Sequence, residues 1–417
     1  MDITLSPAIL KGSLEMPASK SEAHRALICS ALTGAGGKVK CANPADDIMV
    51  TAECLSRLGA DTVYDDGYFT VKPWHRPNNF PKLNCKESGS SLRFLIPVAA
   101  LLGTGAEFVG EGRLPERPLS ELLSVIKGCN ITSQKLPFTL TGQLKAGDFY
   151  LPGNISSQYI SGLLLSLPYL QEESRIIITS ELESSGYVDM TIQVLERFGI
   201  SVTSAPNEWV IAGGEEYRSP SLYQVEGDWS AAAFWLAAGA LGADIVLHGL
   251  NPLSLQPDKA IINILKDFGA EIEVAEGYIK ASRGNLKALD IDASNIPDLV
   301  PILALIASLA EGESRIYNAG RLRMKESNRL STTAELLNAL GGKVSEKDDA
   351  LLITGVNALK GGIRVSGAND HRIVMTAAIA SLFCQEPVTI SGIQAVRKSY
   401  PDFFQDLAAS GGKINVL

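Results

Sequence analysis

A repeat of about 70 residues runs through the whole chain and limits the folds that the chain can adopt. Six segments share one pattern: an apolar run of helical period, a glycine, and two short strand-like runs around a polar turn. The marker glycines are 69, 71, 70, 72 and 70 residues apart, at Gly59, Gly128, Gly199, Gly269, Gly341 and Gly411. Glycine suits the left-handed position that ends a helix before a strand. The spacing therefore predicts six copies of one structural unit.

Each copy contains a second helical segment that is rich in Ala, Leu and Gly and nearly uncharged, as in DWSAAAFWLAAGALG. A helix that is apolar on all sides has to be buried. Each copy is thus predicted to be a βαβαββ-like unit with one buried and one amphipathic helix. Three copies make an α/β domain of ordinary size, so we predict two domains, residues 13–226 and residues 1–12 plus 227–417. An opening strand, Ile3–Leu10, could complete a sheet of either domain.

Composition excludes several classes of protein. With 417 residues, 46% hydrophobic and 20% charged, the chain is too apolar to be disordered and too long for one small module. Its formal net charge of −9 argues against a general nucleic-acid or acidic-membrane binder. We find no signal-peptide pattern and no apolar stretch of the roughly 20 residues that span a bilayer. Six scattered cysteines without a C-x-x-C pair fit reduced thiols, so we expect a cytoplasmic protein.

Polar residues gather where the six buried helices are predicted to begin. These starts are Ser19-Lys20-Ser21 with Arg25, Glu87-Ser88-Gly89-Ser90 with Arg93, Asn154 to Gln158, Glu226-Gly227-Asp228, Asn295 to Asp298, and Asn369-Asp370-His371-Arg372. Helix N-termini with Ser or Asn caps can bind anions. Ordinary capping accounts for the Ser, Asn and Asp residues, but it does not explain why Lys20, Arg25 and Arg372 enter nearly uncharged helices.

Three further basic clusters occur, at Arg113 and Arg117, from Arg321 to Arg329, and at Arg397-Lys398. A single cluster of this kind is more often a solvated surface than a binding site. Together, in an acidic chain, they indicate a site for a multiply anionic small molecule.

The motifs at these positions resemble those of the 5-enolpyruvylshikimate-3-phosphate synthase family, the 3-phosphoshikimate 1-carboxyvinyltransferases of the shikimate pathway. In the order of the family they read PASKSEAHRAL, ESGSSLRF, LPERPL, LPGNISSQYISGLLL, SSGYVDMT, IPDLVPILA, LRMKESNRL, NDHRIVM and VRKSYPDFF. The resemblance covers nearly the whole chain. It implies two domains of the inside-out α/β barrel type, each of three βαβαββ units, with the active site in the cleft between them. It also implies a monomer that serves aromatic amino-acid biosynthesis without a cofactor.

The resemblance further implies the residues that bind the two substrates. Shikimate-3-phosphate is expected at Lys20, Ser21, Arg25, Ser156, Ser157, Gln158, Ser184, Tyr187, Asp298 and Lys325. Phosphoenolpyruvate is expected at Lys20, Gly89, Arg117, Gln158, Arg329, Arg372 and Lys398, in the pocket that glyphosate occupies in this family. These residue types fit, because Arg and Ser suit phosphate oxygens and Tyr offers a flat face with a polar tip.

The family reaction is an addition followed by an elimination. The 5-hydroxyl of shikimate-3-phosphate attacks C2 of phosphoenolpyruvate while the methylene carbon is protonated, and loss of phosphate then gives the enol ether. We expect Asp298 to act on the attacking hydroxyl and Glu326 on the methylene carbon, with Lys20 steadying charge and sharing in proton transfer.

Two features depart from the family pattern. Where much of the family has Asn-Ala-Gly-Thr, this chain has Glu87-Ser88-Gly89-Ser90, and a helix cap or a partner for Arg93 is the simplest role for Glu87. An insertion around Asn318 to Arg323 leaves open which residue replaces a substrate-touching asparagine of the family, with Arg321 as one candidate.

Two other functions compete with this interpretation. UDP-N-acetylglucosamine enolpyruvyl transferase carries a reactive cysteine in a Pro-Gly-Gly-Cys loop, and the corresponding stretch here, FVGEGRLPERPLSELL, has none. A sixfold ring of the DNA-clamp type would need basic charge along its lumen, whereas the charged motifs here differ between repeats. Histidine spacing fits no metal, and P-loop and dinucleotide fingerprints are missing, so we expect no bound metal or nucleotide.

Overall fold

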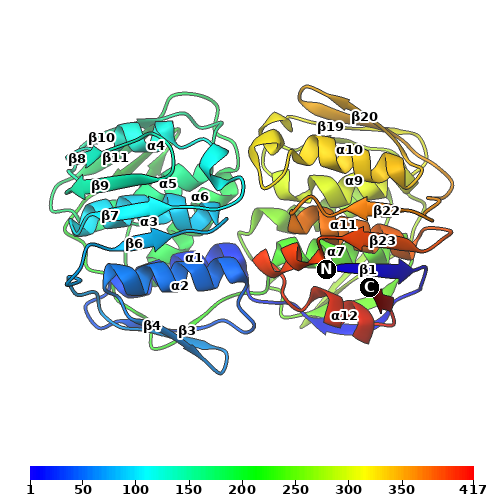
Figure 1. Cartoon of the computed structure of the whole chain (residues 1–417), viewed down its shortest axis with the longest axis horizontal. Coiled ribbons are helices and arrows are strands. Elements are labelled where there is room, and N and C mark those ends of the chain that lie inside the picture. Colours follow the sequence, from blue (N-terminus) through cyan, green and yellow to red (C-terminus); the bar gives the residue numbers. More distant parts are fainter. The chain divides into compact units, whose positions relative to one another are not determined.

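The computed structural model describes residues 1–417, which form two compact units (Figure 1). The continuous unit is Ala18–Val225, and the split unit combines Met1–Pro17 with Glu226–Leu417. Each unit has its own cluster of buried apolar side chains. The division near the N-terminus lies after Pro17 rather than after residue 12, because the strand Lys11–Glu15 (β2) pairs in parallel with Asp244–His248 (β15) of the split unit.

Every sheet has four strands, and all six sheets share one topology. One edge strand pairs in parallel with its neighbour, and the remaining two pairings are antiparallel. Parallel neighbours need a crossover connection, and in four of the six sheets one α-helix lies between them in the chain, whereas in the other two most or all of the continuous unit lies between them. In the continuous unit the sheets are β14 (Tyr223–Gln224), β3 (Gly37–Lys40), β5 (Tyr68–Val71), β4 (Thr62–Asp65); β6 (Lys82–Asn84), β7 (Ala106–Val109), β9 (Phe138–Gly142), β8 (Cys129–Ile131); and β10 (Asp148–Leu151), β11 (Ser174–Ile178), β13 (Glu208–Ile211), β12 (Thr203–Ala205).

The split unit repeats this arrangement. Its sheets are β2, β15, β17 (Tyr278–Ser282), β16 (Glu271–Ala275); β18 (Asp290–Asp292), β19 (Glu313–Tyr317), β21 (Ala350–Thr354), β20 (Lys343–Lys347); and β22 (Arg364–Ser366), β23 (Val388–Ser391), β1 (Asp2–Ser6), β24 (Lys413–Val416). The opening segment Ile3–Leu10 is therefore not a single strand. β1 lies between β23 and β24, where the hydroxyls of Thr4 and Thr389 are 2.9 Å apart, and β2 joins a different sheet of the same unit.

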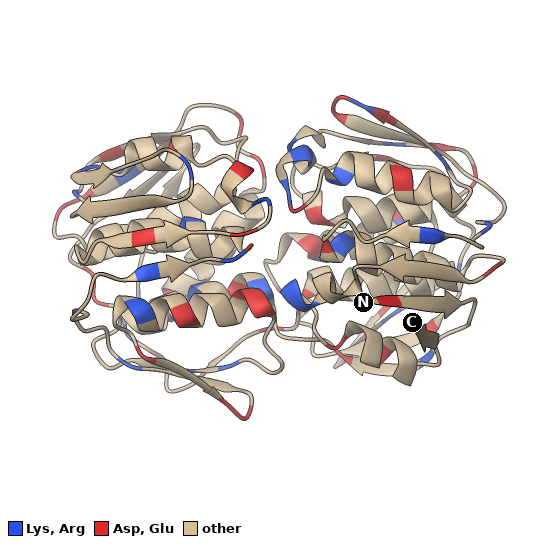
Figure 2. Cartoon of the chain, in the orientation of Figure 1, with Lys and Arg blue, Asp and Glu red and all other residues tan.

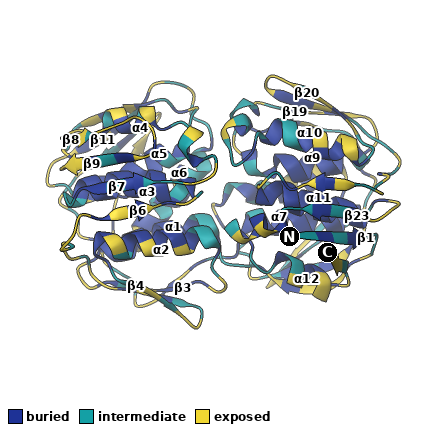
Figure 3. Ribbon diagram, in the orientation of Figure 1, coloured by how far each residue is buried: buried dark blue, intermediate teal, exposed yellow.

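The six apolar helices are buried, as the sequence predicts (Figure 3). They are α1 (Lys20–Leu32), α3 (Gly89–Leu102), α5 (Ser157–Leu164), α7 (Trp229–Leu241), α9 (Val300–Leu309) and α11 (His371–Leu382). In the split unit α7, α9 and α11 contact one another, and in the continuous unit α3 contacts both α1 and α5. The approach of α5 to α3 is close, because a Cβ at Gly162 would lie 2.6 Å from the carbonyl oxygen of Arg93.

The second helix of each repeat is partly exposed, and its last residue lies one to three residues before the marker glycine. These helices are α2 (Asp46–Leu58), α4 (Ser120–Val125), α6 (Ser185–Arg197), α8 (Ile261–Phe268), α10 (Arg329–Ala339) and α12 (Phe403–Ala409). All six marker glycines have positive φ, with values of +109°, +81°, +79°, +101°, +97° and +99° in chain order. The predicted left-handed helix ends are confirmed. Short 3₁₀ turns are η1 (Leu114–Glu116), η2 (Leu167–Tyr169), η3 (Pro257–Ala260), η4 (Pro297–Leu299), η5 (Gly320–Met324) and η6 (Ile393–Lys398).

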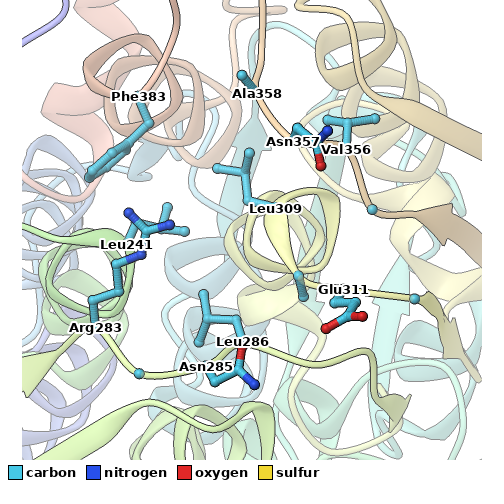
Figure 4. A pocket seen from close by; sticks show the side chains of 14 residues that line it. Leu241, Arg283, Asn285, Leu286, Leu309, Glu311, Val356, Asn357, Ala358 and Phe383 are labelled. Carbon is cyan, nitrogen blue, oxygen red and sulfur yellow. The ribbon is translucent and has the colours of Figure 1, made fainter.

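A cavity of about 450 Å³ lies in the split unit at the C-terminal ends of its three buried helices (Figure 4). Leu241, Leu309 and Phe383, at or just beyond the ends of α7, α9 and α11, contribute to its lining together with Arg283 and Glu311. The cavity is thus at the opposite ends of these helices from the polar motifs that precede them.

All six cysteines are free thiols. The His, Cys, Asp and Glu side chains form no group of three that could hold a metal ion. The longest apolar helices fall short of what is needed to cross a membrane.

Candidate functional site

Arg25 organises the first helix start of the continuous unit. It lies in α1, is almost fully buried, and donates from Nε to Thr191 Oγ1 at 2.7 Å. Its Nη1 donates to the carbonyl oxygen of Ser21 at 2.5 Å, and its Nη2 donates to Ser161 Oγ at 3.1 Å and to the carbonyl oxygen of Tyr187 at 3.0 Å. Burial lowers the pKa of Arg25 to about 10, which leaves the side chain charged at neutral pH. Arg25 therefore ties two other predicted site residues, Ser21 and Tyr187, to one fixed charge.

Lys20 begins the same helix and has an acidic partner from α2. Its Nζ lies 2.9 Å from Asp47 Oδ2, and both side chains are only slightly exposed. Ser19 caps the helix by accepting from the N–H of Glu22 at 3.4 Å. The motif analysis did not identify Asp47, because this carboxylate is recognisable only once α1 and α2 are packed together.

Gln158 connects α5 to α3. Its Oε1 accepts from Arg93 Nη1 at 2.7 Å, and its Nε2 donates to Ser90 Oγ at 2.8 Å. Ser156 caps α5 by accepting from the N–H of Gln158 at 3.3 Å, and Ser157 is buried. The cap of α6, Ser184, is buried in the left-handed conformation with φ of +57°.

The guanidinium group of Arg117 lies directly beside Gly89. A Cβ added at Gly89 would be 2.7 Å from Arg117 Nη1 and 3.0 Å from its Cζ. Arg117 follows η1, and Gly89 begins α3 after the capping Ser88. Glu87 is not the cap of α3, and its carboxylate lies beside Gly112, where a Cβ would be 2.6 Å from Glu87 Oε2. Only glycine at position 89 lets the guanidinium approach the helix start this closely.

Asp298 is the centre of a cationic cluster in the split unit. Its Oδ1 accepts from Arg329 Nη1 at 2.7 Å and lies 3.7 Å from Lys325 Nζ. Its Oδ2 accepts from Arg372 Nη2 at 3.2 Å. Charge is scarce elsewhere in the buried helices of this unit (Figure 2). Three predicted site residues thus meet at the carboxylate of a fourth.

Arg329 contacts three carboxylates at once. Besides Asp298, its Nη2 donates to Glu326 Oε2 at 2.6 Å, and two bonds of 2.8 and 3.2 Å join it to Asp370. Asp370 also accepts from Ser327 Oγ at 3.0 Å and from the N–H of Arg372 at 2.9 Å, which caps α11. Asp370 stood in a predicted helix start but received no role, since its pairing with Arg329 spans 41 residues.

The packing of this cluster shifts the proton affinities of several groups. Burial alone would raise the pKa of Asp298, but Arg372, Lys325 and Arg329 hold that pKa well below its usual range. Burial lowers the pKa of Lys325 to about 8, although a quarter of its side chain reaches solvent and Asp298 favours its charged form. Burial likewise raises the pKa of Asp258 to about 6, against the opposing effect of Arg372. Asp298 is therefore an ionised carboxylate at neutral pH.

Two other predicted candidates lie beside this cluster. Lys398 Nζ donates to the carbonyl oxygen of Asn369 at 2.7 Å, next to Asp370. Arg321 Nη2 donates to the carbonyl oxygen of Ser294, which lies in the segment before η4. The described contacts therefore join Lys398 to the start of α11 and Arg321 to the segment that carries Asp298.

Known proteins resemble this chain over nearly its whole length. A model of the family EPSP synthase (3-phosphoshikimate 1-carboxyvinyltransferase) matches residues 6–407. A 3-phosphoshikimate 1-carboxyvinyltransferase of Clostridium kluyveri is 43% identical over 421 residues, covering 99% of this chain and 98% of that protein. The protein of the same name from Clostridium acetobutylicum is 43% identical over 422 residues, with coverage of 99% and 98%.

Solved structures show the same fold. An EPSP synthase of Acinetobacter baumannii has a TM-score of 0.81 at 25% identity and covers 100% of both chains. The enolpyruvyl transferase NikO of Streptomyces tendae has a TM-score of 0.80 at 20% identity, with 99% of this chain and 98% of that chain covered.

The α/β fold matches that of solved EPSP synthases, and the family model and the curated relatives define the chain as a transferase. Since the family match spans nearly the whole chain and relatives are 43% identical over their length, the chain belongs to the EPSP synthase (3-phosphoshikimate 1-carboxyvinyltransferase) family. The resemblance seen in its motifs is confirmed, and the chain is a transferase of the shikimate pathway.

Proposed function

We propose that this chain transfers the enolpyruvyl group of phosphoenolpyruvate to the 5-hydroxyl of shikimate-3-phosphate, releasing phosphate through a tetrahedral intermediate. The observation that carries the proposal is the meeting of Arg329, Arg372 and Lys325 at Asp298, with distances of 2.7, 3.2 and 3.7 Å. Such a cluster places two arginines and a lysine, groups that can bind an anionic substrate, beside a carboxylate that can move a proton. The product leads to chorismate and the aromatic amino acids.

Shikimate-3-phosphate binds mainly through the continuous unit. Ser156, Ser157 and Ser184 lie at helix starts, where hydroxyl and backbone N–H groups suit phosphate oxygens. Arg25 positions Ser21 and Tyr187 through its hydrogen bonds to their carbonyl oxygens. Its guanidinium group also adds a positive charge, which it keeps at neutral pH. Asp298 and Lys325 of the split unit bind the hydroxyl side of the sugar.

Phosphoenolpyruvate binds through cations of both units. Arg117 beside Gly89, with Lys20 and Gln158, supplies contacts from the continuous unit. The contacts from the split unit are Arg329, Arg372 and Lys398. Each unit is an inside-out α/β barrel domain of three βαβαββ units.

Two carboxylates carry the proton transfers. Asp298 accepts the proton of the 5-hydroxyl while the hydroxyl oxygen forms a bond to C2 of phosphoenolpyruvate. Glu326 donates a proton to the methylene carbon, which becomes a methyl group. In the elimination step the methyl group returns a proton, the C–O bond to phosphate breaks, and the enol ether forms. Lys20, paired with Asp47, stabilises the negative charge that develops near the continuous unit.

The test is phosphate release from phosphoenolpyruvate with three acceptors: shikimate-3-phosphate, shikimate and UDP-N-acetylglucosamine. We expect release with shikimate-3-phosphate and far less with shikimate, which lacks the phosphate. Release with UDP-N-acetylglucosamine alone would overturn the proposal in favour of the other enolpyruvyl transfer reaction.

The proposed setting is the cytoplasm, with the enzyme acting as a monomer. Six free thiols support this location, because cytoplasmic proteins keep their cysteines reduced. A single chain contains both clusters of proposed site residues, so the reaction needs no residue from a second copy. Sedimentation at working concentration measures the oligomeric state.

A further inference from the structure

Arg329 offers a ligand only one edge of its guanidinium group. The side chain is 2% exposed, and the edge that pairs with Asp370 is closed because the Asp370 side chain is 0% exposed. Asp298 and Glu326 cover the other edge, and their side chains are 20% and 16% exposed. An anion that reaches Arg329 therefore arrives where these two carboxylates now lie.

Asp298 also bridges Arg329 to the second arginine. One of its oxygens accepts from Arg329 at 2.7 Å and the other accepts from Arg372 at 3.2 Å, so the carboxylate spans two guanidinium groups. A carboxylate or phosphate group of a substrate binds paired arginines in the same way. Asp298 thus occupies, within the protein, the position of a ligand anion.

The charges of this cluster leave little attraction for an added anion. Lys325, Arg329 and Arg372 are matched by Asp298, Glu326 and Asp370. Like charges held together in a partly buried site oppose one another strongly. Asp370 is held by two bonds from Arg329, one from Ser327 and one from the start of α11, so it is fixed in place. Asp298 is the carboxylate that both arginines share and that solvent can reach.

We propose that Asp298 competes with the substrate anion for Arg329 and Arg372, so that binding of the anion releases this carboxylate to act on the attacking hydroxyl. The inference rests on the proposed function, because it takes the two arginines as the residues that bind phosphoenolpyruvate. While the arginines hold Asp298, they keep the pKa of its carboxyl well below its usual range and make it a weak base. An anion that draws the arginines away leaves a more basic carboxylate. Asp298 then acts as a base only when phosphoenolpyruvate is bound.

The test is anion binding by Asp298→Asn, which keeps the shape of the side chain but removes its charge. Sulfate is the probe, because it remains a dianion across the working pH range. Calorimetric titration is expected to show that Asp298→Asn binds sulfate roughly tenfold more tightly than the unmodified chain, since a competing like charge is gone. If Asp298 merely supported the arginines, the same variant would bind sulfate more weakly.

Asp292→Asn is the matched control. Asp292 ends β18, six residues before Asp298, and its carboxylate accepts from the N–H of Ser294 at 2.9 Å and from Asn318 Nδ2 at 3.1 Å rather than from a cation. This variant removes the same charge without freeing an arginine, so its sulfate affinity should stay within about twofold. Equal tightening in both variants would overturn the proposal by showing a general charge effect.

Unchanged or weaker binding by Asp298→Asn, with its circular dichroism and thermal unfolding preserved, would also overturn the proposal. Asp298→Ser gives the same comparison with a smaller neutral side chain if the asparagine variant does not fold. Sulfate binding involves no turnover. Failure of this test therefore leaves phosphate release from phosphoenolpyruvate intact, and failure of phosphate release leaves the sulfate result standing.

Discussion

Asp370→Asn should destabilise the split unit more than any other single neutral replacement in the charged cluster. Asp370 accepts four hydrogen bonds: Oδ2 from Arg329 Nε and Ser327 Oγ, and Oδ1 from Arg329 Nη2 and the N–H of Arg372. Whichever way the asparagine amide turns, its NH₂ group faces two donors. The substitution thus removes two acceptors and one buried charge while it keeps the volume of the side chain.

The magnitude follows from what remains around Arg329. Removing one partner of a buried ion pair costs about 3–5 kcal/mol. Asp298 and Glu326 still neutralise Arg329 at 2.7 and 2.6 Å, so we expect the lower end, about 3 kcal/mol. In a unit of roughly 200 residues this corresponds to a fall in Tm of roughly 6–12 °C.

Tryptophan fluorescence can report on this unit alone. Trp229 and Trp235 lie in α7 of the split unit and are at most 1% exposed, whereas Trp74 and Trp209 belong to the continuous unit. Replacing the latter two by phenylalanine leaves both emitters in the split unit, and urea unfolding then gives its free energy. Ser327→Ala, which removes one bond to Asp370, is the control and should cost about 1 kcal/mol. A cost below about 1 kcal/mol for Asp370→Asn would refute the argument.

Three further outcomes are expected. Because burial lowers the pKa of Lys325 to about 8, affinity for shikimate-3-phosphate should fall as pH rises through 8. Between pH 8 and the unfolded pKa of about 10.4 the free energy of unfolding should increase, because the unfolded chain holds the proton of Lys325 more tightly than the folded chain does. Lys325→Arg should abolish the fall in affinity in calorimetric titrations, and a persistent fall would exclude Lys325 as its cause. Gly89→Ala puts a Cβ 2.7 Å from Arg117 Nη1, so the guanidinium group has to shift. Steady-state kinetics should then show a larger rise in the inhibitory concentration of glyphosate than in the KM for phosphoenolpyruvate, and equal rises would contradict this. Asp298→Asn and Glu326→Gln should each lower kcat by roughly two or more orders of magnitude in quenched-flow assays, and near-normal turnover in either would remove that residue from the mechanism.

Local backbone requirements made much of the fold readable from the sequence. A glycine such as Gly59 or Gly269 is needed where the chain leaves a helix with positive φ, and the amide of each bonds back to carbonyl oxygens of the last turn. A run such as that of α7 has no polar face, so it can only be buried. Both signals depend on neighbouring residues, which is why they could be recognised without the structure.

Pairings between distant residues could not be recognised in this way. The composition of a strand does not show which other strand it pairs with. For example, β1 lies between β23 and β24, and β14 pairs with β3. The same limit applied to the site. Motifs located Lys20 and Arg329, but the carboxylates that hold them, Asp47 and Asp370, come from other helices. Only packing decides which charges meet.

The two units differ in the residues at the N-termini of their buried helices. In the continuous unit the buried helices begin with capping hydroxyls, Ser19, Ser88 and Ser156. In the split unit the corresponding starts carry aspartates: Asp228 and Asp370 cap α7 and α11, and Asp298 lies in the turn before α9.

This difference has an electrostatic consequence. A serine cap is neutral and leaves the positive end of the helix dipole available to an anion, whereas an aspartate cap neutralises that end. The repeated scaffold therefore supplies three helix ends suited to a substrate phosphate in one unit. In the other unit it supplies carboxylates, and two of them, Asp298 and Asp370, are paired with arginines. The proposed proton transfer by Asp298, and its proposed competition with the substrate, both depend on the aspartate in the turn before α9, whereas the continuous unit has serine caps at its helix starts.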